Sequence, residues 1–319
     1  MALFLCEKDV CQVLNMPLAL EAVETALREN ALGGAISIPR ERTRIRKGAL
    51  HILQGAVDCV EVIGFKVYTS TREGNRFLVH LYHAASGRLE AILEANFLGM
   101  LRTGAASGVA SRYLSRPESC VVGMFGAGWQ ARGQLAALCQ VRPISQAKVL
   151  ARNREKLEEF CREQSHQLGI EVVPADNPQD VVRGSDILTT VTTSPTPLLE
   201  SDWLEPGCHI NAVGSNALIR TELDEKTIRR CDPVVVDARD VAARECGDLL
   251  PLLEKGRIRW TQIGELGEII VERRPGRTRA EQISLFESHG MAIQDLTLAA
   301  QALQLAREQG LGLELPFGD

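Results

Sequence analysis

The sequence lacks the spacings that typical zinc and redox sites use. Its nine cysteines form no Cys-x-x-Cys pair, and its six histidines show neither His-Glu-x-x-His nor His-x-His. An odd number of scattered cysteines, several in apolar segments, favours reduced and buried thiols over a disulfide framework. We therefore predict no metal site and a reducing, cytoplasmic environment.

Long apolar runs and strong net charge are missing as well. No segment reaches the roughly 18 apolar residues that a membrane span needs, and the start, MALFLCEKDV, lacks the basic segment of a signal peptide. The net charge is −5, which gives nucleic acid or an anionic membrane no electrostatic attraction. The basic cluster at residues 40–47 is either a solvated strand face or a site for a small anion.

The first hundred residues predict strands that follow one another rather than alternate with helices. Residues 16–30 carry apolar positions at helical spacing, with Pro17 at the start of the pattern. Strand-like segments come next, and a small apolar helix at 95–114 closes this region. The pattern favours a largely antiparallel sheet. The predicted strands cover residues 48–57, 60–70, 76–84 and 89–95.

From Ser119 onward, short apolar strands alternate with helices, which is typical of a doubly wound parallel sheet. The last predicted helix, 291–309, has an apolar stripe suited to packing on the first domain. We therefore predict an α/β protein in which a doubly wound Rossmann domain is inserted into an α+β domain. The predicted Rossmann domain is 117–291, and the α+β domain is 1–116 with 292–319.

A glycine-rich loop follows the first strand of the predicted Rossmann domain. FGAGWQA places Gly126, Gly128 and Ala131 in the Gly-x-Gly-x-x-Ala spacing, between a strand and a helix. Gly126 would permit the tight turn, and Gly128 would let a pyrophosphate approach the backbone. Free N–H groups near Trp129 and Gln130 suit an anion. The loop predicts a dinucleotide cofactor.

The end of the second strand bears on which dinucleotide is used. An acid there would bind the ribose 2′-hydroxyl of NAD, but the sequence reads VLARNREK, with no acid before Glu155. Arg152, Asn153 and Arg154 stand where a 2′-phosphate would lie. We predict a preference for NADPH, with NADH possible, although one of the two arginines could equally belong to a solvated basic turn.

Three basic residues are candidates for binding an acid substrate. Lys66 interrupts an apolar strand; spacing alone slightly favours a sheet edge, where the amine would reach water, over a cleft suited to proton transfer. Arg102 lies among small and apolar residues and needs a carboxylate partner, either internal or on a substrate. Arg42 shares that ambiguity within the basic cluster.

Eight short segments occur along the chain in this order: IPRERTR, GFK, LRTGAASGVASRYL, GAGWQA, INAVGSN, GDLL, IGELGEI and SHGMAIQD. Together they resemble the ornithine cyclodeaminase/mu-crystallin family, along nearly the whole chain. The resemblance implies a homodimer that binds a small imino, 2-oxo or amino acid, with the α+β domain serving substrate binding and dimerisation. It matches Lys66, Arg102 and Asp295 to catalytic positions, and Arg42 (or Arg40 or Arg44) with Asn216 to substrate binding. The cofactor positions implied are Arg102, Thr103, Gly126, Ala127, Gly128, Trp129, Gln130, Arg152, Asn153, Arg154, Thr192, Thr193, Ala212, Val213, Gly214 and Met291.

The family includes redox-neutral cyclodeaminases, imine reductases, alanine dehydrogenases and non-catalytic ligand-binding crystallins. Cyclodeaminases carry an aspartate at the position of Asn216, a candidate base for an amine. An imine is already unsaturated and needs no such base, so the amide favours reduction. We therefore expect an NAD(P)H-dependent reductase of cyclic imino acids, or of a 2-oxo acid with an amine. Ornithine cyclodeaminase and a non-catalytic NADPH-binding protein remain the alternatives.

Overall fold

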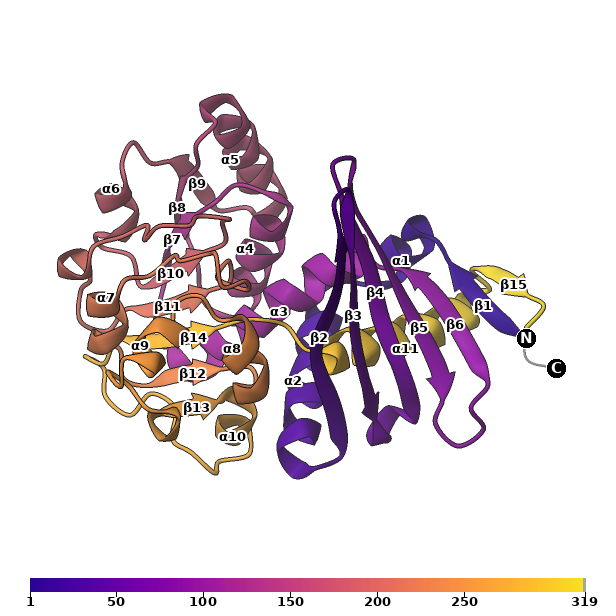
Figure 1. The fold of residues 1–319 in the computed structure, drawn as a ribbon. Helices are drawn as coiled ribbons and strands as arrows, with labels where there is room; N and C mark the ends of the chain where they lie inside the picture. The colour runs from indigo at the N-terminus through magenta and orange to yellow at the C-terminus, as the bar shows by residue number, and fades with distance from the viewer. Residues whose placement is uncertain (318–319) are drawn as a thin grey trace. The chain divides into compact units, whose positions relative to one another are not determined.

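The computed structural model describes residues 1–317 and divides them into two compact units (Figure 1). Unit 1 holds Met1–Arg102 and the chain from Gly290 onward, and unit 2 holds Thr103–His289. The sequence places the first boundary at 116, whereas the units divide inside helix α3 (Asn96–Leu114). The second half of α3 belongs to unit 2 because Gly104 lies against the backbone of Gly133, too close for any Cβ.

Unit 1 is built on a seven-stranded sheet that is antiparallel except between β1 and β6, as the succession of strands predicted. Three of its strands were not predicted: β1 and β15 are too short for a pattern to reveal, and the β2 segment stood out in the sequence only for its basic residues. The strands, in spatial order, are β15 (Leu313–Leu315), β1 (Ala2–Leu5), β6 (Leu89–Glu94), β5 (Gly74–His83), β4 (Val62–Thr71), β3 (Gly48–Val57) and β2 (Ala35–Ile45).

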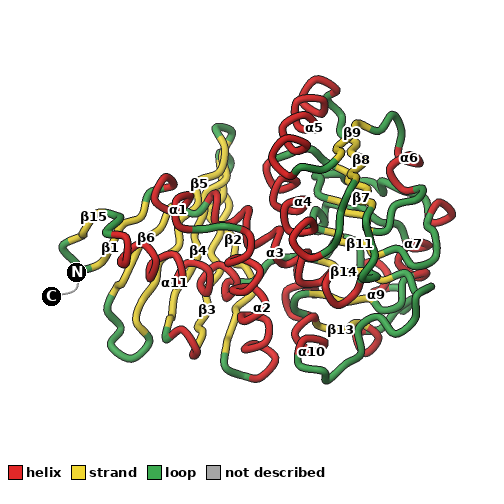
Figure 2. The backbone as a smooth tube through the Cα atoms, turned by 180° about the vertical axis from the view of Figure 1, so that it is seen from behind, coloured by secondary structure: helices red, strands yellow, loops and turns green. Residues whose placement is uncertain are grey.

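Three helices, α1 (Glu7–Val13), α2 (Met16–Leu32) and α11 (Ala292–Gln309), complete unit 1. Helix α11 packs on α2 and crosses β3 and β4, which Figure 2 shows from behind. The approach is close because Gly64 has no side chain: a Cβ there would lie 2.9 Å from Leu296. The predicted return of the last helix to the first domain is therefore correct. No helix within residues 1–317 has the length and hydropathy to cross a membrane.

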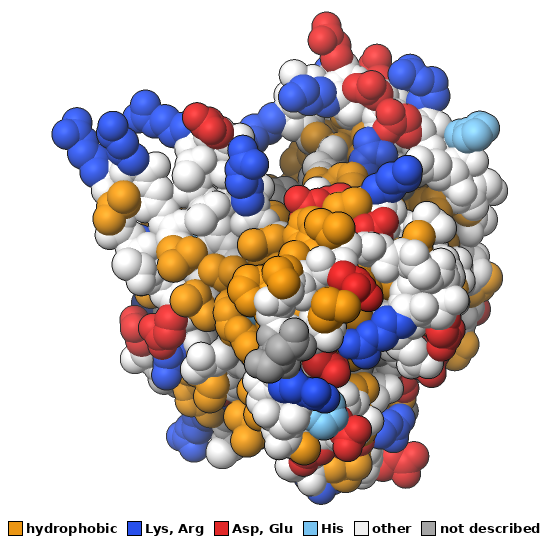
Figure 3. All heavy atoms as spheres, turned by 90° about the vertical axis from the view of Figure 1, so that its right-hand side faces the viewer, with side chains coloured by type: hydrophobic (Ala, Val, Ile, Leu, Met, Phe, Trp, Pro, Cys, Tyr) orange, Lys and Arg blue, Asp and Glu red, His pale blue; other side chains and the backbone are white. Residues whose placement is uncertain are grey.

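The opposite face of the unit 1 sheet is left uncovered by these helices. Exposed aliphatic side chains alternate along its strands with the buried ones that face α11, as period-two patterning requires. Figure 3, which views the molecule from the right-hand side of Figure 1, shows that hydrophobic side chains also reach the surface on that side. An exposed apolar surface of this kind typically marks a protein–protein contact. The exposed residues are Ile36, Ile38, Leu50, Ile52 and Ile63.

Unit 2 contains an eight-stranded sheet in which every pair is parallel. The order reverses between β7 and β10, which makes the doubly wound arrangement of a Rossmann domain. Ligands of such sheets bind outside the carboxyl ends of the strands at this point. The spatial order is β13 (Ile263–Glu265), β12 (Val234–Val236), β14 (Ser284–Glu287), β11 (His209–Ala212), β10 (Ile187–Thr190), β7 (Val121–Phe125), β8 (Gln146–Leu150) and β9 (Glu171–Pro174).

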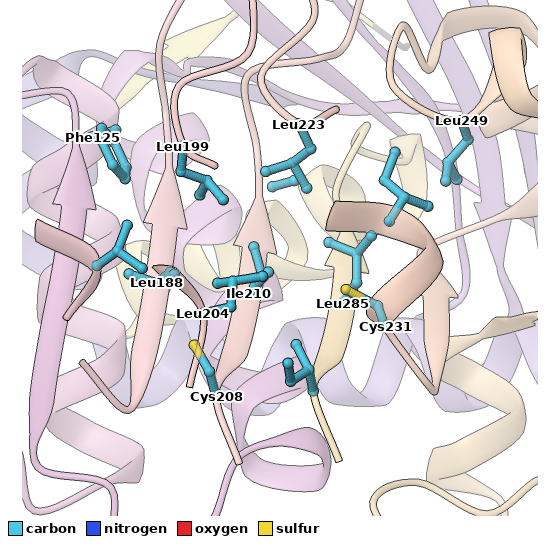
Figure 4. Packing of buried hydrophobic residues seen from close by; sticks show 14 of the residues in the cluster. Phe125, Leu188, Leu199, Leu204, Cys208, Ile210, Leu223, Cys231, Leu249 and Leu285 are labelled. Carbon is cyan, nitrogen blue, oxygen red and sulfur yellow. The ribbon is translucent and has the colours of Figure 1, made fainter. Parts of the chain in front are cut away.

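The core of unit 2 lies against both faces of this sheet. Leu188, Ile210 and Leu285 are register partners on neighbouring strands and stand side by side in one core cluster (Figure 4). Two strands were not predicted from the sequence: the three-residue β13, and β14, a central strand whose four residues end in a buried glutamate. The helices are α4 (Trp129–Val141), α5 (Arg154–Leu168), α6 (Pro178–Val182), α7 (Glu225–Arg230), α8 (Arg239–Glu245), α9 (Leu250–Glu254) and α10 (Leu266–Ile270).

Candidate active site

Unit 1 buries a cluster of two cations around one carboxylate. Lys66 on β4 is 3% exposed, and its Nζ donates to Oδ1 of Asp295 at 2.8 Å. Arg102 on α3 donates from Nε to the same oxygen at 3.2 Å. The other oxygen, Oδ2, is buried and accepts no hydrogen bond within residues 1–317. The cluster therefore has one carboxylate oxygen left for a further donor.

Glycines make room for this cluster. A Cβ at Gly99 would lie 3.1 Å from Nζ of Lys66, and Gly290 has a φ of +84° where a Cβ would collide with the Arg102 guanidinium. Gln294 accepts from Nη1 of Arg102 at 3.2 Å. Asp295 lies in the first turn of α11, where the helix dipole favours a negative charge.

The environment of Lys66 suits proton transfer near neutral pH. Burial lowers the pKa of Lys66 to about 8, helped by the charges of Arg102 and Arg40, although Asp295 opposes the shift. The slight preference for a sheet edge was wrong, because β4 lies between β3 and β5 and the side chain faces α11. A lysine with this pKa can both hold and release a proton under physiological conditions.

Arg42 lies one row away from Lys66 on the same sheet face. It pairs with His51 on β3, which pairs with Tyr68 on β4, two residues beyond Lys66. The guanidinium of Arg40 is 6.0 Å from the centre of the Tyr68 ring. Arg42 and Arg40 therefore both remain candidates for binding a carboxylate near Lys66.

In unit 2, the glycine loop has the local geometry that its spacing predicted. Gly126 has a φ of +113°, and a Cβ there would lie 2.6 Å from the carbonyl oxygen of Val191. Gly128 caps α4 and has open space where a Cβ would be. Ala131 is fully buried, which lets α4 pack closely. The loop leaves the helix N-terminus, with exposed Trp129 beside it, accessible to a phosphate.

In the basic turn after β8, one residue caps a helix, one forms ion pairs and one is exposed to solvent. Asn153 caps α5 by accepting from the backbone N–H of Lys156 at 2.9 Å. Arg154 forms ion pairs with Glu158 at 2.8 Å and Asp176 at 3.0 Å. Arg152 is exposed. Of the two arginines, Arg154 has acidic neighbours that hold it, so Arg152 is the stronger candidate for a 2′-phosphate.

A buried glutamate that the sequence analysis missed joins the loops after β10 and β11. Glu222 accepts from the backbone N–H of Thr192 at 2.7 Å and its hydroxyl at 2.6 Å, and from the N–H of Gly214 at 2.8 Å. Asp248 in turn accepts from the N–H of Glu222 at 2.8 Å. Both loops contain predicted cofactor residues, so Glu222 fixes their positions. No local sequence pattern connects Glu222 to these loops, so it could not be identified from the sequence.

Glu222 belongs to a group of buried acids with Asp248 and Glu287. Ser215 donates to Glu287 at 2.9 Å. Burial raises the pKa of all three carboxyls, that of Asp248 to about 7, and their mutual repulsion adds to the increase for Asp248 and Glu287. Cys246, Glu287 and His289 also bring ligand atoms within 4.8 Å of one another, a group able to hold a metal ion. The absence of a metal stays a prediction.

Asn216, the residue that favours reduction, lies at the end of the loop after β11. Its Oδ1 accepts from Nη1 of Arg220 at 2.8 Å. The side chain is half-buried, so the amide is held by a neighbouring cation rather than by solvent alone.

The other predicted cofactor residues lie in two parts of the structure. Most follow the carboxyl ends of unit 2 strands, whereas Met291 caps α11 in unit 1. Thr103 accepts from Gln134 of α4 through its backbone oxygen at 3.1 Å. Their roles stay predictions. The strand-end residues are Ala127, Thr192, Thr193, Ala212, Val213 and Gly214.

Comparisons with known proteins agree over almost the full length. Residues 2–310 match the sequence profile of the ornithine cyclodeaminase/mu-crystallin family. A Δ1-pyrroline-2-carboxylate reductase from Bacillus cereus is 32% identical, over 96% of this chain and 97% of its own. The Thermococcus litoralis Δ1-pyrroline-2-carboxylate reductase in complex with NADH and L-proline is 33% identical with a TM-score of 0.94, over 98% of this chain and 100% of that one.

A third similar structure is an archaeal alanine dehydrogenase dimer with bound NAD. It is 30% identical with a TM-score of 0.93, and the match covers 99% of both chains. The ordered motifs, the inserted Rossmann domain and these matches lead to one conclusion: the chain belongs to the ornithine cyclodeaminase/mu-crystallin family.

Proposed function

We propose that this protein is an NAD(P)H-dependent reductase that forms an L-amino acid from a cyclic 2-imino acid, or from a 2-oxo acid and an amine. The observation that carries the proposal is the buried Lys66–Asp295–Arg102 cluster, in which the lysine pKa is about 8. The reductases among the relatives support the same reaction class.

Each residue has a distinct role in this proposal. Protonated Lys66 gives a proton to the imine nitrogen, and Asp295 holds the lysine while keeping it charged near neutral pH. Arg102 and Arg42 bind the substrate carboxylate, so that the imine carbon is fixed relative to the lysine. The Gly126–Ala131 loop would hold the dinucleotide, which would supply the hydride.

The preferred cofactor in this proposal is NADPH. Arg152 supports it, because its guanidinium is exposed at the turn where a 2′-phosphate would be recognised. We expect Arg152→Ser to lower the NADPH to NADH ratio of kcat/KM about 10-fold or more, a loss typical of one charged hydrogen bond. Arg154→Ser is the matched control, and an equal effect of both variants would remove Arg152 from this role.

The direct test is cofactor oxidation by the purified protein. NADPH and NADH are each supplied with Δ1-pyrroline-2-carboxylate, Δ1-piperideine-2-carboxylate, or pyruvate plus an amine. Steady oxidation with formation of the L-amino acid supports the proposal. Absence of turnover with all of these substrates contradicts it. Release of ammonia and proline from ornithine, with only catalytic NAD, would instead make the protein a cyclodeaminase.

The same proposal includes a homodimer. Its support is the uncovered apolar face of the unit 1 sheet, to which Ile36, Ile52 and Ile63 contribute. Light scattering of the wild type is expected to give twice the chain mass. Ile52→Asp places a charge on that face and is expected to shift the protein toward the monomer, whereas an unchanged mass would contradict the use of this face.

A further inference from the structure

His51 is a buried polar side chain beside the candidate catalytic lysine. On the face of the unit 1 sheet that packs on α11, one row of cross-strand partners is Leu53, Lys66 and Val79. The adjacent row contains Arg42, His51, Tyr68 and Phe77. His51 is therefore a diagonal neighbour of Lys66 and a direct neighbour of Arg42.

The imidazole has no hydrogen-bond partner within residues 1–317. His51 is 8% exposed, and neither Nδ1 nor Nε2 makes a hydrogen bond to any of the described residues. Leaving such a group buried and unpaired is unfavourable, so native structures rarely keep one without a reason. A bound ligand that completes the pairing would supply such a reason.

The orientation of the ring leaves both nitrogens available. His51 and Tyr68 are stacked with their ring centres 4.2 Å apart and 2° between their planes. Ring nitrogens point outward in the plane of the ring, so the stack covers a face of the imidazole and not its N–H. Tyr68 fixes the ring without using its hydrogen-bonding capacity.

The imidazole is neutral at physiological pH. Burial, together with the charges of Arg42, Arg40 and Arg44, lowers the pKa of His51 to about 4. A neutral imidazole has one N–H donor and one acceptor nitrogen. It can add a hydrogen bond to an anion here without adding another positive charge to a region that already has several.

We propose that His51 is a substrate-binding residue whose ring N–H donates a hydrogen bond to the substrate carboxylate, next to Arg42. The inference rests on the proposed reductase function, and it extends the carboxylate site beyond the two arginines. Because every candidate substrate shares this carboxylate, His51 contributes to binding of the whole class of 2-imino acids rather than to one side chain.

Two substitutions separate this role from a packing role. His51→Phe keeps an aromatic ring to stack on Tyr68 but removes both nitrogens, whereas His51→Gln loses the stack and keeps an N–H donor. We expect His51→Phe to raise KM for the imino acid about 10- to 100-fold, the loss of one hydrogen bond to a charged group, with KM for the cofactor unchanged. His51→Gln is expected to recover most of this loss.

If His51→Phe were more active than His51→Gln, the inference would be overturned, because the stacking of the ring and not its hydrogen bond would then matter. A loss confined to some of the imino acids would also overturn it, since the carboxylate is common to all. Equal loss across Δ1-pyrroline-2-carboxylate, Δ1-piperideine-2-carboxylate and pyruvate plus ammonia supports it.

Product binding provides a readout that does not require turnover. Calorimetric titration of L-proline into protein saturated with NAD⁺ or NADP⁺ is expected to show about 10-fold or greater weakening in His51→Phe relative to wild type and His51→Gln. If the wild type binds L-proline but reduces no imino acid, the proposed function fails while this binding role stands. If the wild type is active and His51→Phe matches it in KM and L-proline affinity, only the role of His51 fails.

Discussion

The two units bury charged side chains in opposite ways. Unit 1 places two cations around one carboxylate, and Lys66 and Arg102 share a single oxygen of Asp295. Unit 2 gathers three carboxyls, Glu222, Asp248 and Glu287, whose oxygens accept from backbone N–H groups and hydroxyls. In the first group opposite charges are paired, and in the second several acids share one buried region.

This difference determines what each group can do. In unit 1 the pKa of Lys66 falls to about 8, so its proton is exchangeable near neutral pH. In unit 2 burial raises the carboxyl pKa values, and the acids fix strand-end loops through directed hydrogen bonds. We infer that the group in unit 1 is suited to proton transfer and the group in unit 2 to holding the strand-end loops in position. The following substitutions test that division.

The largest effect is expected from Lys66→Met. It removes the proton donor and keeps a side chain of similar length, so turnover should fall by about 10³-fold or more, near the upper range for general acid catalysis. Cofactor affinity, measured by fluorescence titration of NADPH, should stay within about 2-fold. Lys148→Met on β8 of unit 2 is the control with the same chemical change. Substantial activity in Lys66→Met would exclude Lys66 as the donor.

The sequence predicted the features that depend on local patterns. The strands of unit 1 at 48–57 and 89–95 follow alternation, and the Gly126–Ala131 loop follows from turn sterics, so both could be located from neighbouring residues. The parallel sheet of unit 2 was predicted from alternating strands and helices. Family resemblance, rather than spacing, identified Asp295 as part of the site.

The features that the sequence did not predict depend on contacts between distant segments. Glu222 and Gly214 are brought together by the loops after two strands, and β14 inserts between β11 and β12 although it comes later in the chain. The strand pattern left two positions open for Lys66 and slightly favoured the sheet edge, because periodicity does not distinguish an edge strand from an interior one. His51 was missed because pairing with Arg42 and Tyr68 exists only in the folded sheet.

Glu222→Ala should give the next largest effect, this time on stability. It leaves the N–H groups of Thr192 and Gly214 without their acceptor, and each unpaired buried donor costs about 1–3 kcal/mol. We expect the free energy of unfolding to fall by about 3 kcal/mol in urea titrations. Glu225→Ala is the control, since its ion pairs with Arg229 and Arg257 are at the surface. Equal effects would show that Glu222 does not fix the loops.

Asp295→Asn should change the pH dependence of turnover more than its maximum. Reduction needs protonated Lys66, so the wild-type rate should fall as pH rises through about 8. Removing the charge of Asp295 lowers the lysine pKa further, and the descending limb should move to lower pH. At pH 8 we expect a loss of about 10- to 100-fold in kcat/KM, shrinking toward pH 6. An unmoved limb would mean that another group controls it.

Glu287→Gln should give the smallest effect, and in the favourable direction. A carboxyl whose pKa is raised by folding keeps a proton that the unfolded chain releases, so stability declines as pH rises from the unfolded value toward the folded one. For Glu287 the decline begins at its ordinary value of 4.5, because burial and the charge of Asp248 raise its pKa well above that value in the folded protein. Replacing Glu287 removes this titration, while an amide oxygen can still accept from Ser215. We expect about 1 kcal/mol of added stability at pH 8, near 2–4 °C in Tm, and little change at pH 4.

Glu281→Gln, at an exposed position shortly before β14, is the control and should change the stability at neither pH. A gain for Glu287→Gln that is equal at both pH values would show that packing, and not charge, sets unit 2 apart from the paired cluster of unit 1.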